Sequence, residues 1–531
     1  MAAALVIKQH GGRPLILEKQ GMVGGSSSYS GGVAWIPNND HLKAAGADDS
    51  YDKSMTYLNA VIGDVGPASS HAKRDMFVRH GSEMVRFLES FGMKFLHASW
   101  PDYYSSKPGG LAEGRSLVSP LFDIGSLGDW ADKLAFYAGW PPLPVGAYES
   151  GALTRIKTTW AGKWMVAKLV MRMIYQSVTG KRLRGSGNAM QGRLLQILLR
   201  EGVPIWTHTA VKSLQVESGR VIGVVAEREG KEILLRGTSG VLINAGGFSH
   251  NQAMREQYQP PPATNRWTVA NPGDTGEMIL AAQNIGASID LMNESWWVPG
   301  SFFPDGKLAG FHVPNDAGKP HCIVVNLQGN RFGNESGAYM EFGQRMYACG
   351  AVPAWAILES RNRANYTWGT SMPGKVPEEW IRSGYMKKSD SLEDLARQCG
   401  IDPVGLRNTV ERFNEFCRKG VDEDWQRGES AYNRYNGDPS HTPNPSLGSI
   451  EKPPYYAVAI YPSDVGTSGG LMTDEFARVL RDDGSVIDGL YATGNSTASV
   501  MGRAYVGAGA SIGASYIFGY VAARHARGLA L

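Results

Sequence analysis

A glycine-rich segment near the C-terminus holds residues whose types and spacing point to chemistry. A short apolar strand, residues 489–492, leads into Thr493, Gly494 and Asn495. The loop and apolar helix that follow contain four glycines, Gly502, Gly507, Gly509 and Gly513. Glycine lets the backbone approach a flat ligand where a β-carbon would collide. The start of the helix presents free N–H groups and the positive end of its dipole, which suits a ring that becomes anionic, such as a reduced flavin.

One tyrosine, Tyr505, lies in that loop, four residues before Gly509. This arrangement resembles the 3-ketosteroid Δ1-dehydrogenases, flavoproteins that desaturate ring A of 3-oxosteroids. The resemblance implies that the Tyr505 hydroxyl and the Gly509 backbone amide hold the 3-keto oxygen of the substrate. The family usually has proline after the tyrosine, where this chain has Val506, a difference that removes no donor. The plain alternative is that Tyr505 only packs inside a loop that closes the helix.

Composition limits the class of protein. A chain of 531 residues suggests two to four domains, and 42% hydrophobic residues exclude global disorder. The 66 glycines show no collagen-like period and fit many close backbone contacts with a nucleotide. Lys and Arg number 53 against 50 Asp and Glu, a net charge of +3. This balance gives no case for a nucleic-acid surface, so we expect no nucleic-acid partner.

The cysteines indicate the redox compartment. Cys322, Cys349, Cys399 and Cys417 are widely spaced, with no CxxC pair and no histidine spacing typical of zinc. We therefore expect no metal site, and four reduced, buried thiols in a reducing compartment such as the cytoplasm. No apolar run is long enough to span a bilayer.

The N-terminus departs from the usual pattern of nucleotide-binding proteins. Residues 1–8 read as the body of a helix, without the strand and the GxGxxG turn that normally precede it. We therefore expect a truncated or alternatively started form of a longer protein, which would bind FAD weakly or fold poorly and whose cellular location is uncertain. Residues 13–18 read as the next strand. It ends at Glu18, which is placed to accept hydrogen bonds from the ribose hydroxyls of the adenosine.

Small residues follow this acid. Residues 24–32 match the loop that related flavoproteins run along the pyrophosphate and the flavin, although a flexible Gly/Ser linker is the alternative. The resemblance implies cofactor contacts by Lys19, Gly25, Ser26, Ser27, Ser30, Gly31 and Gly32.

The middle of the chain supports the same architecture. Residues 191–201 show helical leucine spacing, and strands over 203–208, 210–215, 221–227 and 232–235 predict a β-meander. Val211 matches the position that pins the adenine edge in the family. Residues 240–248 read as a buried strand ending in glycines. The resemblance adds cofactor contacts by Ala245, Gly246, Gly494, Asn495, Ser511 and Ile512.

These patterns predict an α/β fold: a Rossmann-like FAD-binding domain of the glutathione-reductase type with an inserted α+β substrate domain. More aromatics and prolines mark residues 263–451 as the insertion. The FAD-binding domain would then comprise residues 1–262 and 452–531. Substrates commonly bind in the cleft between two such domains.

Two further tyrosines complete the candidate catalytic set. Tyr339 follows Asn334 and Glu335, on a loop after a predicted hairpin, and the resemblance makes it the base facing ring A. The resemblance also implies an auxiliary tyrosine in residues 99–104. We assign it to Tyr103, which follows Pro-Asp, with Tyr104 as the fallback. For any single tyrosine, packing in a core is the common alternative.

The chemistry needs all three phenols. Desaturation beside a 3-ketone removes a proton from carbon 2 and a hydride from carbon 1. Donors on the ketone oxygen acidify the carbon-2 hydrogen, because negative charge builds there. A tyrosine base starts from a pKa near ~10. A hydrogen bond from Tyr103 to Tyr339 and a dry site with a cationic end are two ways to lower that pKa. The flavin N5 would take the hydride.

Other partners follow from this interpretation. The substrate is a small apolar 3-keto compound, a steroid or a triterpenoid, and an external electron acceptor must reoxidise the flavin. Residues 160–175 alternate Trp and Met with Lys and Arg. This segment is a candidate for peripheral membrane contact, although a packed surface helix is the more common case.

Three alternatives remain at this point. A flavin reductase of the fumarate-reductase type shares the nucleotide-binding halves but needs arginines and a histidine for a dicarboxylate, and Arg503 is present in the loop. A Δ4 steroid desaturase uses related chemistry. A flavin-free, truncated protein without enzyme activity would bind apolar ligands or nothing.

Overall fold

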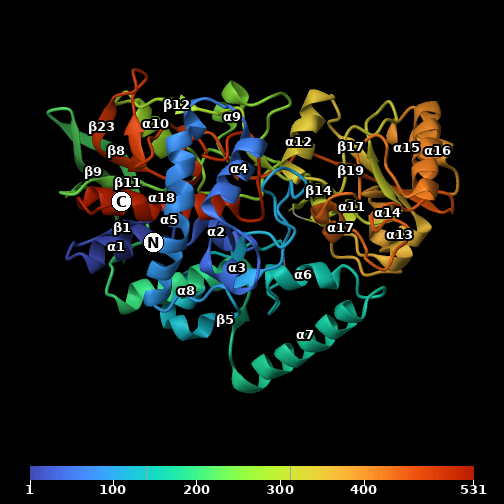
Figure 1. Ribbon diagram of the computed structural model, residues 1–531, viewed down its shortest axis with the longest axis horizontal. Helices are drawn as coiled ribbons and strands as arrows, with labels where there is room; N and C mark the ends of the chain where they lie inside the picture. The colour runs from blue at the N-terminus through green and yellow to red at the C-terminus, as the bar shows by residue number, and fades with distance from the viewer. Residues whose placement is uncertain (140, 311) are drawn as a thin grey trace.

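The computed structural model describes residues 1–139, 141–310 and 312–531. Figure 1 shows two lobes side by side, with helix α7 (Trp160–Thr179) projecting below them. The terminal lobe contains both ends of the chain. The inserted lobe is built around the sheet β16–β17–β19–β18.

Short parallel strands form the centre of the terminal lobe. Strand β1 (Ile16–Leu17) pairs in parallel with β7 (Ile205–Trp206), and β11 (Val241–Ile243) pairs in parallel with β23 (Val486–Ala492). Strand β22 (Arg478–Leu480) lies antiparallel on the other side of β23. The predicted meander forms from β8 (Thr209–Glu217), β9 (Arg220–Arg228) and β10 (Lys231–Arg236). Segments from both ends of the chain therefore meet in this lobe.

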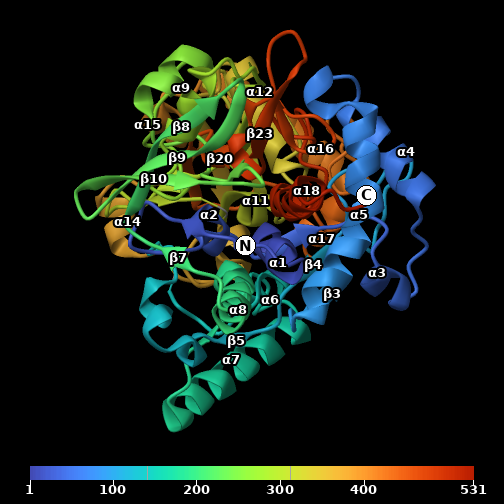
Figure 2. The same cartoon turned by 90° about the vertical axis from the view of Figure 1, so that its left-hand side faces the viewer.

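Helix α18 (Ala510–Ala526) is the core of the terminal lobe. It is apolar on nearly all sides, so it can be buried all round. It packs in one hydrophobic cluster with α1 (Ala2–Gln9), β2 (Val33–Trp35) and α5 (His71–Ser90). Figure 2 shows α18 end-on, enclosed between α1 and α5.

Glycines set how closely α18 approaches β2. Gly509 has φ of +89°, and a Cβ there would lie 2.2 Å from the Val33 carbonyl oxygen. A Cβ on Gly513 would lie 2.2 Å from the Trp35 carbonyl oxygen. The Trp35 N–H donates to the Gly509 carbonyl at 3.0 Å. Glycine is therefore required for this contact, which fixes the start of α18.

The inserted lobe is an antiparallel sheet covered by helices. Strands β16 (Cys322–Val325), β17 (Ala354–Glu359), β19 (Tyr455–Ile460) and β18 (Met386–Ser389) pair in that order. Helices α15 (Leu392–Cys399) and α16 (Pro403–Lys419) pack beside this sheet. Strand β19 lies beyond residue 451, the predicted end of the inserted domain, yet it pairs with β17 along its whole length. The sheet of the inserted lobe therefore extends to Ile460.

Two further strand pairs join residues 289–297 to residues 464–471. Strand β12 (Ile289–Asp290) pairs with β21 (Gly470–Leu471), and β13 (Ser295–Trp297) pairs with β20 (Asp464–Thr467). Further helices are α3 (Asp40–Ala44), α4 (Tyr51–Ile62), α6 (Ala147–Leu153), α8 (Ser186–Arg200), α9 (Gln252–Tyr258), α10 (Glu277–Gln283), α11 (His312–Ala317), α13 (Ser360–Asn365), α14 (Glu378–Arg382) and α17 (Ala431–Asn436). Further strands are β3 (Leu96–Ala98), β4 (Ser116–Val118), β5 (Phe122–Asp123), β6 (Leu183–Arg184), β14 (Ser301–Phe302) and β15 (Leu308–Ala309).

Three expectations from the sequence need correction. The predicted loop 24–32 contains a one-turn helix, α2 (Gly25–Tyr29), because small residues also allow a tight helical turn. Tyr339 is the first residue of helix α12 (Tyr339–Ala348) and does not lie on a loop. All four cysteines are free, but Cys349 is exposed, because it lies at the end of α12 where the helix meets solvent.

Candidate active site

Three tyrosines from distant parts of the chain meet between the two lobes. The ring centroids of Tyr103 and Tyr339 are 5.1 Å apart, those of Tyr103 and Tyr505 5.6 Å, and those of Tyr339 and Tyr505 5.4 Å. Tyr103 and Tyr505 are each 5% exposed. All three belong to the core around α18, with Tyr339 partly buried at its margin. The predicted catalytic tyrosines thus form one phenol cluster.

Their hydroxyl groups point toward one another. The Tyr103 hydroxyl donates to the Tyr339 oxygen at 3.2 Å. Burial raises the pKa of both phenols well above the ordinary value, and it also raises the pKa of Tyr505. A dry cluster of this kind holds phenols neutral unless a further group stabilises the anion.

Polar groups at the start of α18 surround the Tyr505 hydroxyl. The Tyr505 oxygen lies 3.3 Å from the Ser511 Oγ. Hydrogen bonds from Ser511, Tyr339 and the Gly509 N–H favour the Tyr505 anion and so partly offset the effect of burial on its pKa. The Tyr505 hydroxyl and the Gly509 N–H are therefore neighbours, and two neighbouring donors can hold an oxygen that gains negative charge.

A buried ionic network holds the loop that carries Tyr103. Arg115 pairs with Asp49 at 2.7 Å and also with Asp102, the residue before Tyr103, and all three side chains are fully buried. Burial raises the pKa of Asp102 to about 6, although Arg115 opposes this rise. Because both carboxylates are held by one guanidinium, the loop has little freedom to move.

The same loop is tied to the one that carries Tyr505. The Tyr103 N–H donates to the Val506 carbonyl at 3.1 Å, and the Tyr57 hydroxyl donates to the same carbonyl at 2.6 Å. Tyr104, the fallback assignment, points elsewhere, with Glu341 and Arg345 among its neighbours. The geometry therefore favours Tyr103 over Tyr104 as the partner of Tyr339.

Glu335 anchors the segment before Tyr339. Its carboxylate pairs with Arg331 at 2.8 Å and with Arg427 at 3.0 Å. Burial alone would raise the pKa of Glu335, but the two arginines outweigh it and lower the pKa to about 2. A small pocket next to Tyr339 is lined mostly by apolar side chains, Pro299, Val313, Pro314, Ala317 and Phe342, together with Glu335.

The candidate cofactor residues lie where the parallel strands end. Strand β1 is followed by Glu18, β11 by Asn244 and Ala245, and β23 by Thr493. The Asn244 amide donates to Ser515 of α18 at 3.0 Å, and the Ala245 N–H donates to the Ser496 Oγ at 3.0 Å. Ends of strands from distant parts of the chain thus converge on the first turns of α18, where Ser511 and Ile512 lie.

Asp274 joins several predicted cofactor residues. The Ser26 hydroxyl donates to its carboxylate at 2.8 Å, and a Cβ on Gly246 would lie 2.2 Å from the same carboxylate. Burial raises the pKa of Asp274 to about 7, against the hydrogen bond from Ser26. This aspartate belongs to the GDTG run at residues 273–276, and only the fold places it beside Ser26.

Lys19 and Glu18 point in different directions. Lys19 forms an ion pair with Glu277 and donates to Thr275 at 2.9 Å. The Glu18 carboxylate accepts from the Gln20 N–H at 2.8 Å, and the Glu18 carbonyl accepts from the Thr209 N–H at 2.9 Å. Val211 lies two residues further along β8, so it is close to the end of β1 as an adenine contact requires.

The other predicted contacts lie around α2. Gly25, Ser26 and Ser27 are in the helix, and the Ser30 hydroxyl donates to the Ser27 carbonyl at 2.8 Å. A Cβ on Gly32 would lie 2.1 Å from the Ser186 backbone, and Gly31 also borders close side chains. These residues form a tight backbone turn beside α8.

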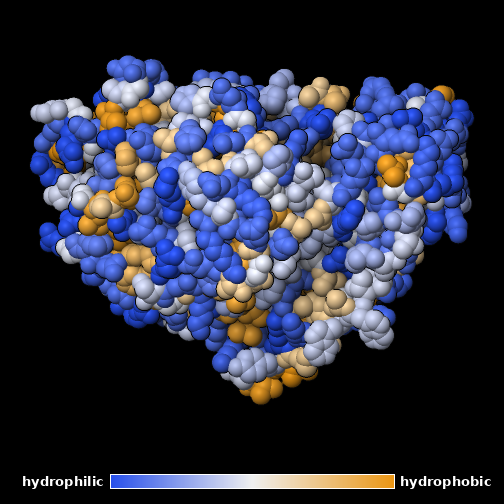
Figure 3. All heavy atoms as spheres, in the orientation of Figure 1, coloured by the Kyte–Doolittle hydropathy of each residue, from blue (hydrophilic) through white to orange (hydrophobic). Residues whose placement is uncertain are grey.

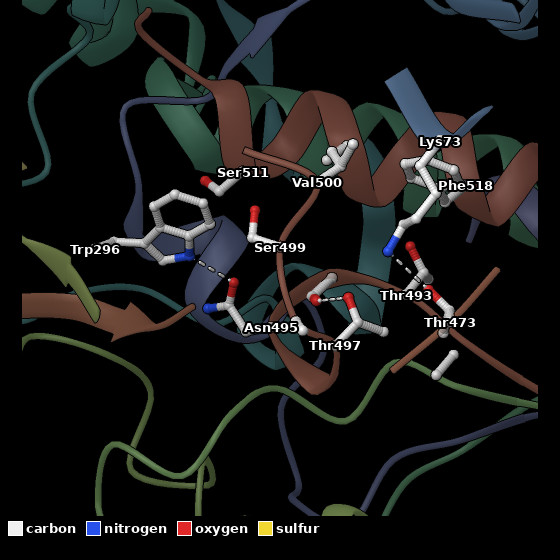
Figure 4. A pocket seen from close by; sticks show the side chains of 14 residues that line it. Lys73, Trp296, Thr473, Thr493, Asn495, Thr497, Ser499, Val500, Ser511 and Phe518 are labelled. Atoms are coloured by element: carbon white, nitrogen blue, oxygen red, sulfur yellow. Dashed lines mark hydrogen bonds between the residues drawn. The ribbon is translucent and has the colours of Figure 1, made fainter. Parts of the chain in front are cut away.

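Figure 4 shows a pocket between α18 and residues 493–500. The Asn495 side chain accepts from the Trp296 Nε1 at 2.9 Å, and the Trp296 ring packs edge-on against Tyr505 with centroids 5.1 Å apart. Gly494 and Asn495 thus connect the end of β23 to the phenol cluster. At the other end of the pocket Lys73 donates to Thr473 at 3.2 Å, and burial lowers the pKa of Lys73 to about 8.

The residues present fit FAD. Asn244 and Ala245 are exposed at the end of the parallel strand β11, where a bound ligand would cover them. The Ser28 Oγ is buried without a hydrogen-bond partner among the described residues. The start of the seventeen-residue helix α18 has no side-chain cap. Fold and site together define a flavin-dependent oxidoreductase.

Comparison with known proteins supports this class of protein. The FAD binding domain model of the FAD_binding_2 family matches residues 1–512. The 3-oxosteroid 1-dehydrogenase of Mycobacterium tuberculosis is 40% identical over 99% of this chain and 96% of its own length. The crystal structure of 3-ketosteroid Δ1-dehydrogenase from Sterolibacterium denitrificans, in complex with 1,4-androstadiene-3,17-dione, has a TM-score of 0.92 at 37% identity, and the match covers 99% of this chain and 97% of that one.

The chain belongs to the 3-oxosteroid 1-dehydrogenase family of FAD-binding proteins. The predicted fold class, the oxidoreductase class and the FAD cofactor are confirmed. A flavocytochrome c3 fumarate reductase shares the fold alone, with a TM-score of 0.62 at 19% identity, over 99% of this chain and 75% of that one. The roles of individual site residues stay predictions, which the geometry above makes specific.

Sequence reasoning missed several residues of the site. Trp296 and Tyr432 both pack against the phenol cluster, and Asp102 holds its loop. Tyrosines and tryptophans are common in cores, so sequence alone gave no signal for the first two. In the sequence Asp102 stands out only as the neighbour of Tyr103, and its burial against Arg115 appears only in the fold.

Proposed function

We propose that this protein is an FAD-dependent 3-oxosteroid 1-dehydrogenase, which introduces a double bond between carbons 1 and 2 of ring A. The single observation that carries the proposal is the convergence of Tyr103, Tyr339 and Tyr505 at the start of α18. Membership of the family and the 40% identity to a 3-oxosteroid 1-dehydrogenase support it.

The ketone oxygen lies between two donors. Its partners are the Tyr505 hydroxyl and the Gly509 N–H, which lie next to each other. Both donors are preorganised, because Gly509 is fixed against β2 and the loop is tied to Tyr103. They stabilise the negative charge that develops on the oxygen as carbon 2 loses its proton.

Tyr339 is the base that takes the proton from carbon 2. Its anion is stabilised by the hydrogen bond from the Tyr103 hydroxyl. Because the cluster is buried, water is excluded from the developing enolate.

FAD supplies the acceptor for the hydride that leaves carbon 1. Residues that fit it are Glu18 for the ribose, the turn at Ser26 and Ser27 for the pyrophosphate, and Asn495, Ser511 and Ile512 for the flavin ring. These groups would hold the cofactor, and the main contribution of the protein to the reaction would be to place the reacting groups.

Product analysis tests this proposal. The FAD-loaded protein is incubated with a 3-oxosteroid that is saturated at carbons 1 and 2, together with an artificial electron acceptor. We expect a product with a new 1,2 double bond. A new double bond at carbons 4 and 5, formed from a 5α-reduced substrate, would instead identify the Δ4 desaturase alternative.

The alternative of a flavin reductase that binds a dicarboxylate is less consistent with the loop that carries Arg503 and Tyr505. Arg503, the arginine that such a reductase would use, pairs with Glu294 at 2.6 Å and also donates to Asn293. The three phenols present neutral hydroxyl groups, which match a ketone. The FAD family membership also argues against the flavin-free alternative.

We also propose two further partners, an electron acceptor and the surface of a membrane. Turnover requires an external electron acceptor, because reduced flavin must be reoxidised before the next cycle. The second partner is the surface of a membrane with anionic lipids, contacted by residues 160–175 of α7. Within the described residues no helix combines the length and apolar character needed to cross a bilayer, so this contact is peripheral.

The surface of α7 supports membrane contact. The side chains of Trp160, Trp164 and Val178 are 83%, 62% and 81% exposed. Further exposed apolar side chains on the helix are Val166, Val170, Met171, Met173, Ile174 and Tyr175. Figure 3 shows apolar atoms at the lower tip of the molecule, where Figure 1 places α7. The helix carries Lys163, Lys168 and Arg172 and no acidic residue, a composition typical of interfacial helices.

A further inference from the structure

Trp296 contacts two residues to which different parts of the site are assigned. It lies on β13 and is 3% exposed. Its ring packs at 78° to that of Tyr505, the proposed donor to the ketone oxygen, with ring centroids 5.1 Å apart. Its Nε1 donates to the Asn495 Oδ1 at 2.9 Å, and Asn495 is a candidate contact of the flavin ring (Figure 4). One buried side chain therefore connects the ketone donor to the flavin contact.

This hydrogen bond fixes the orientation of the Asn495 amide. The oxygen and the nitrogen of an asparagine amide are similar in size, so only their hydrogen bonds distinguish the two ends. An indole N–H can donate and cannot accept, so the atom that faces Trp296 is the carbonyl oxygen. The Asn495 Nδ2, which has two hydrogens to donate, must then lie on the side away from Trp296.

Gly466 lies beside the nitrogen end of the same amide. A Cβ on Gly466 would lie 2.4 Å from the Asn495 Nδ2, so a side chain at this position would displace the nitrogen. Gly466 belongs to β20, the strand that pairs with β13. The amide is thus held by two neighbouring strands, with its oxygen at Trp296 and its nitrogen at Gly466.

The hydrogens of the Asn495 Nδ2 are available to a ligand. Among the described residues this nitrogen has no hydrogen-bond partner, and the side chain is only partly buried. Asn495 follows the end of β23 and lines the pocket of Figure 4 together with Ser511 of α18, a second candidate contact of the flavin ring. A donor whose direction is fixed in this way can bind an acceptor atom of the cofactor.

We propose, on the basis of the function proposed above, that Trp296 is a positioning residue for the flavin. Its N–H holds the Asn495 carbonyl oxygen, and so directs the Asn495 Nδ2 toward an acceptor atom of the isoalloxazine ring. Trp296 acts through Asn495.

The direction of the amide decides whether the ring meets a donor or an acceptor. The acceptor atoms of a flavin gain negative charge when it is reduced. A donor beside them favours cofactor binding and also favours the reduced form, because a hydrogen bond to a charged group is stronger than one to a neutral group. If the amide turned over, the Asn495 oxygen would face the same atoms, and repulsion would replace the hydrogen bond.

Replacing Trp296 with β-(3-benzothienyl)alanine tests the proposal. In this isostere sulfur takes the place of the indole N–H, so the ring still packs against Tyr505 and one donor is lost. We expect the Kd for FAD to rise by about threefold to tenfold, as loss of one hydrogen bond does. Trp296→Phe, which also lacks the N–H, should raise this Kd too.

The reduction potential of the bound flavin is the second measurement. With the isostere at position 296, we expect the equilibrium between the two flavin forms to shift by about threefold to tenfold toward the oxidised form. For a two-electron couple this shift lowers the potential by about 14 to 30 mV.

Trp297 provides the matched control. Its Nε1 donates to the Glu294 carboxylate at 3.3 Å, not to Asn495. The same isostere at position 297 should leave the Kd for FAD and the flavin potential unchanged.

Asn495→Ala separates positioning from packing. In that variant the residue through which Trp296 acts is gone, so adding the isostere at position 296 should change neither the Kd for FAD nor the potential any further.

Two results would overturn the proposal. One is an isostere at position 296 with the wild-type Kd for FAD and the wild-type potential. The other is an equal shift with and without the Asn495 side chain, which would mean that Trp296 acts by packing alone. Failure of the proposed function is recognised separately, because these measurements use no steroid: the wild-type protein would then bind FAD and leave the steroid unchanged.

Discussion

At the scale of single residues, the groups around each phenol decide the role of that tyrosine. Tyr505, Tyr339 and Tyr103 are chemically alike, but their neighbours differ. Tyr505 lies beside the Gly509 amide and Ser511, which suits a donor to an oxygen that gains charge. Tyr339 receives a hydrogen bond from Tyr103, which suits a base. Environment therefore divides the roles among identical side chains.

Tyr505→Phe tests the donor role. The ring still packs against Trp296, but one of two donors to the ketone oxygen is lost. We expect kcat to fall by roughly a hundredfold or more, with FAD content unchanged. Tyr175→Phe, a substitution on the exposed face of α7, is the control and should leave kcat unaltered. A Tyr505→Phe enzyme with wild-type kcat would remove this residue from the mechanism.

The sequence predicts those features that depend on local pattern. The glycines around residue 509, the acid at Glu18 and the meander all have local signatures, and the structure places them together. Tyr432 has no such signature, because its importance comes from contacts with residues hundreds of positions away. The GDTG run is visible in the sequence, but the contact of its aspartate with Ser26 appears only in the fold. The short helix α2 was missed because serine and glycine are typical of loops and give no helical period.

At the scale of elements, the contact between α18 and β2 positions the donors. A Cβ on Gly513 of α18 would collide with the Trp35 carbonyl, whereas a Cβ on Gly519, less than two turns later, would have no neighbour closer than 4.0 Å. The two glycines therefore differ in whether a side chain can be accommodated, although both lie in the same helix.

Gly513→Ala should force α18 away from β2. We expect it to destabilise the protein by roughly 1–3 kcal/mol, as overpacking does, and to lower kcat by moving Gly509. Gly519→Ala should be neutral or stabilise by up to about 1 kcal/mol, since alanine favours a helix. Thermal unfolding of the two variants and the wild type measures these changes in stability. Equal melting temperatures for both variants would contradict the assigned role of the α18–β2 contact.

At the scale of the whole molecule, α7 is an exposed helix that contributes no residue to the candidate active site. Lys168 and Arg172 pair with Glu149 of α6 at 3.4 and 2.7 Å, which fixes the helix to the body. Lys163 lies over the Trp160 ring at 4.6 Å. The two exposed tryptophans are therefore held on a helix that is fixed to the body of the protein, as a membrane anchor for an enzyme with an apolar substrate would require.

The double substitution Trp160→Ser and Trp164→Ser tests membrane contact. Co-sedimentation with vesicles of phosphatidylcholine and phosphatidylglycerol should fall by about tenfold or more, because burying each apolar side chain contributes roughly 1.5–3 kcal/mol. Turnover of a dissolved steroid should stay the same. Val216→Ser with Leu234→Ser, which removes exposed apolar side chains from the meander, is the control. Equal sedimentation of all three proteins would exclude α7 as the contact.

We propose above all that a ketone held at the start of α18 allows a proton and a hydride to be removed from ring A. Anaerobic mixing of the FAD-loaded protein with a 3-oxosteroid, followed by flavin absorbance, tests it most directly. The matching 3-hydroxysteroid is the comparison, because it has the same ring system and lacks the carbonyl oxygen. We predict that the ketone bleaches the flavin and that the alcohol does not. Bleaching by both steroids at the same rate, or by neither, would contradict the account.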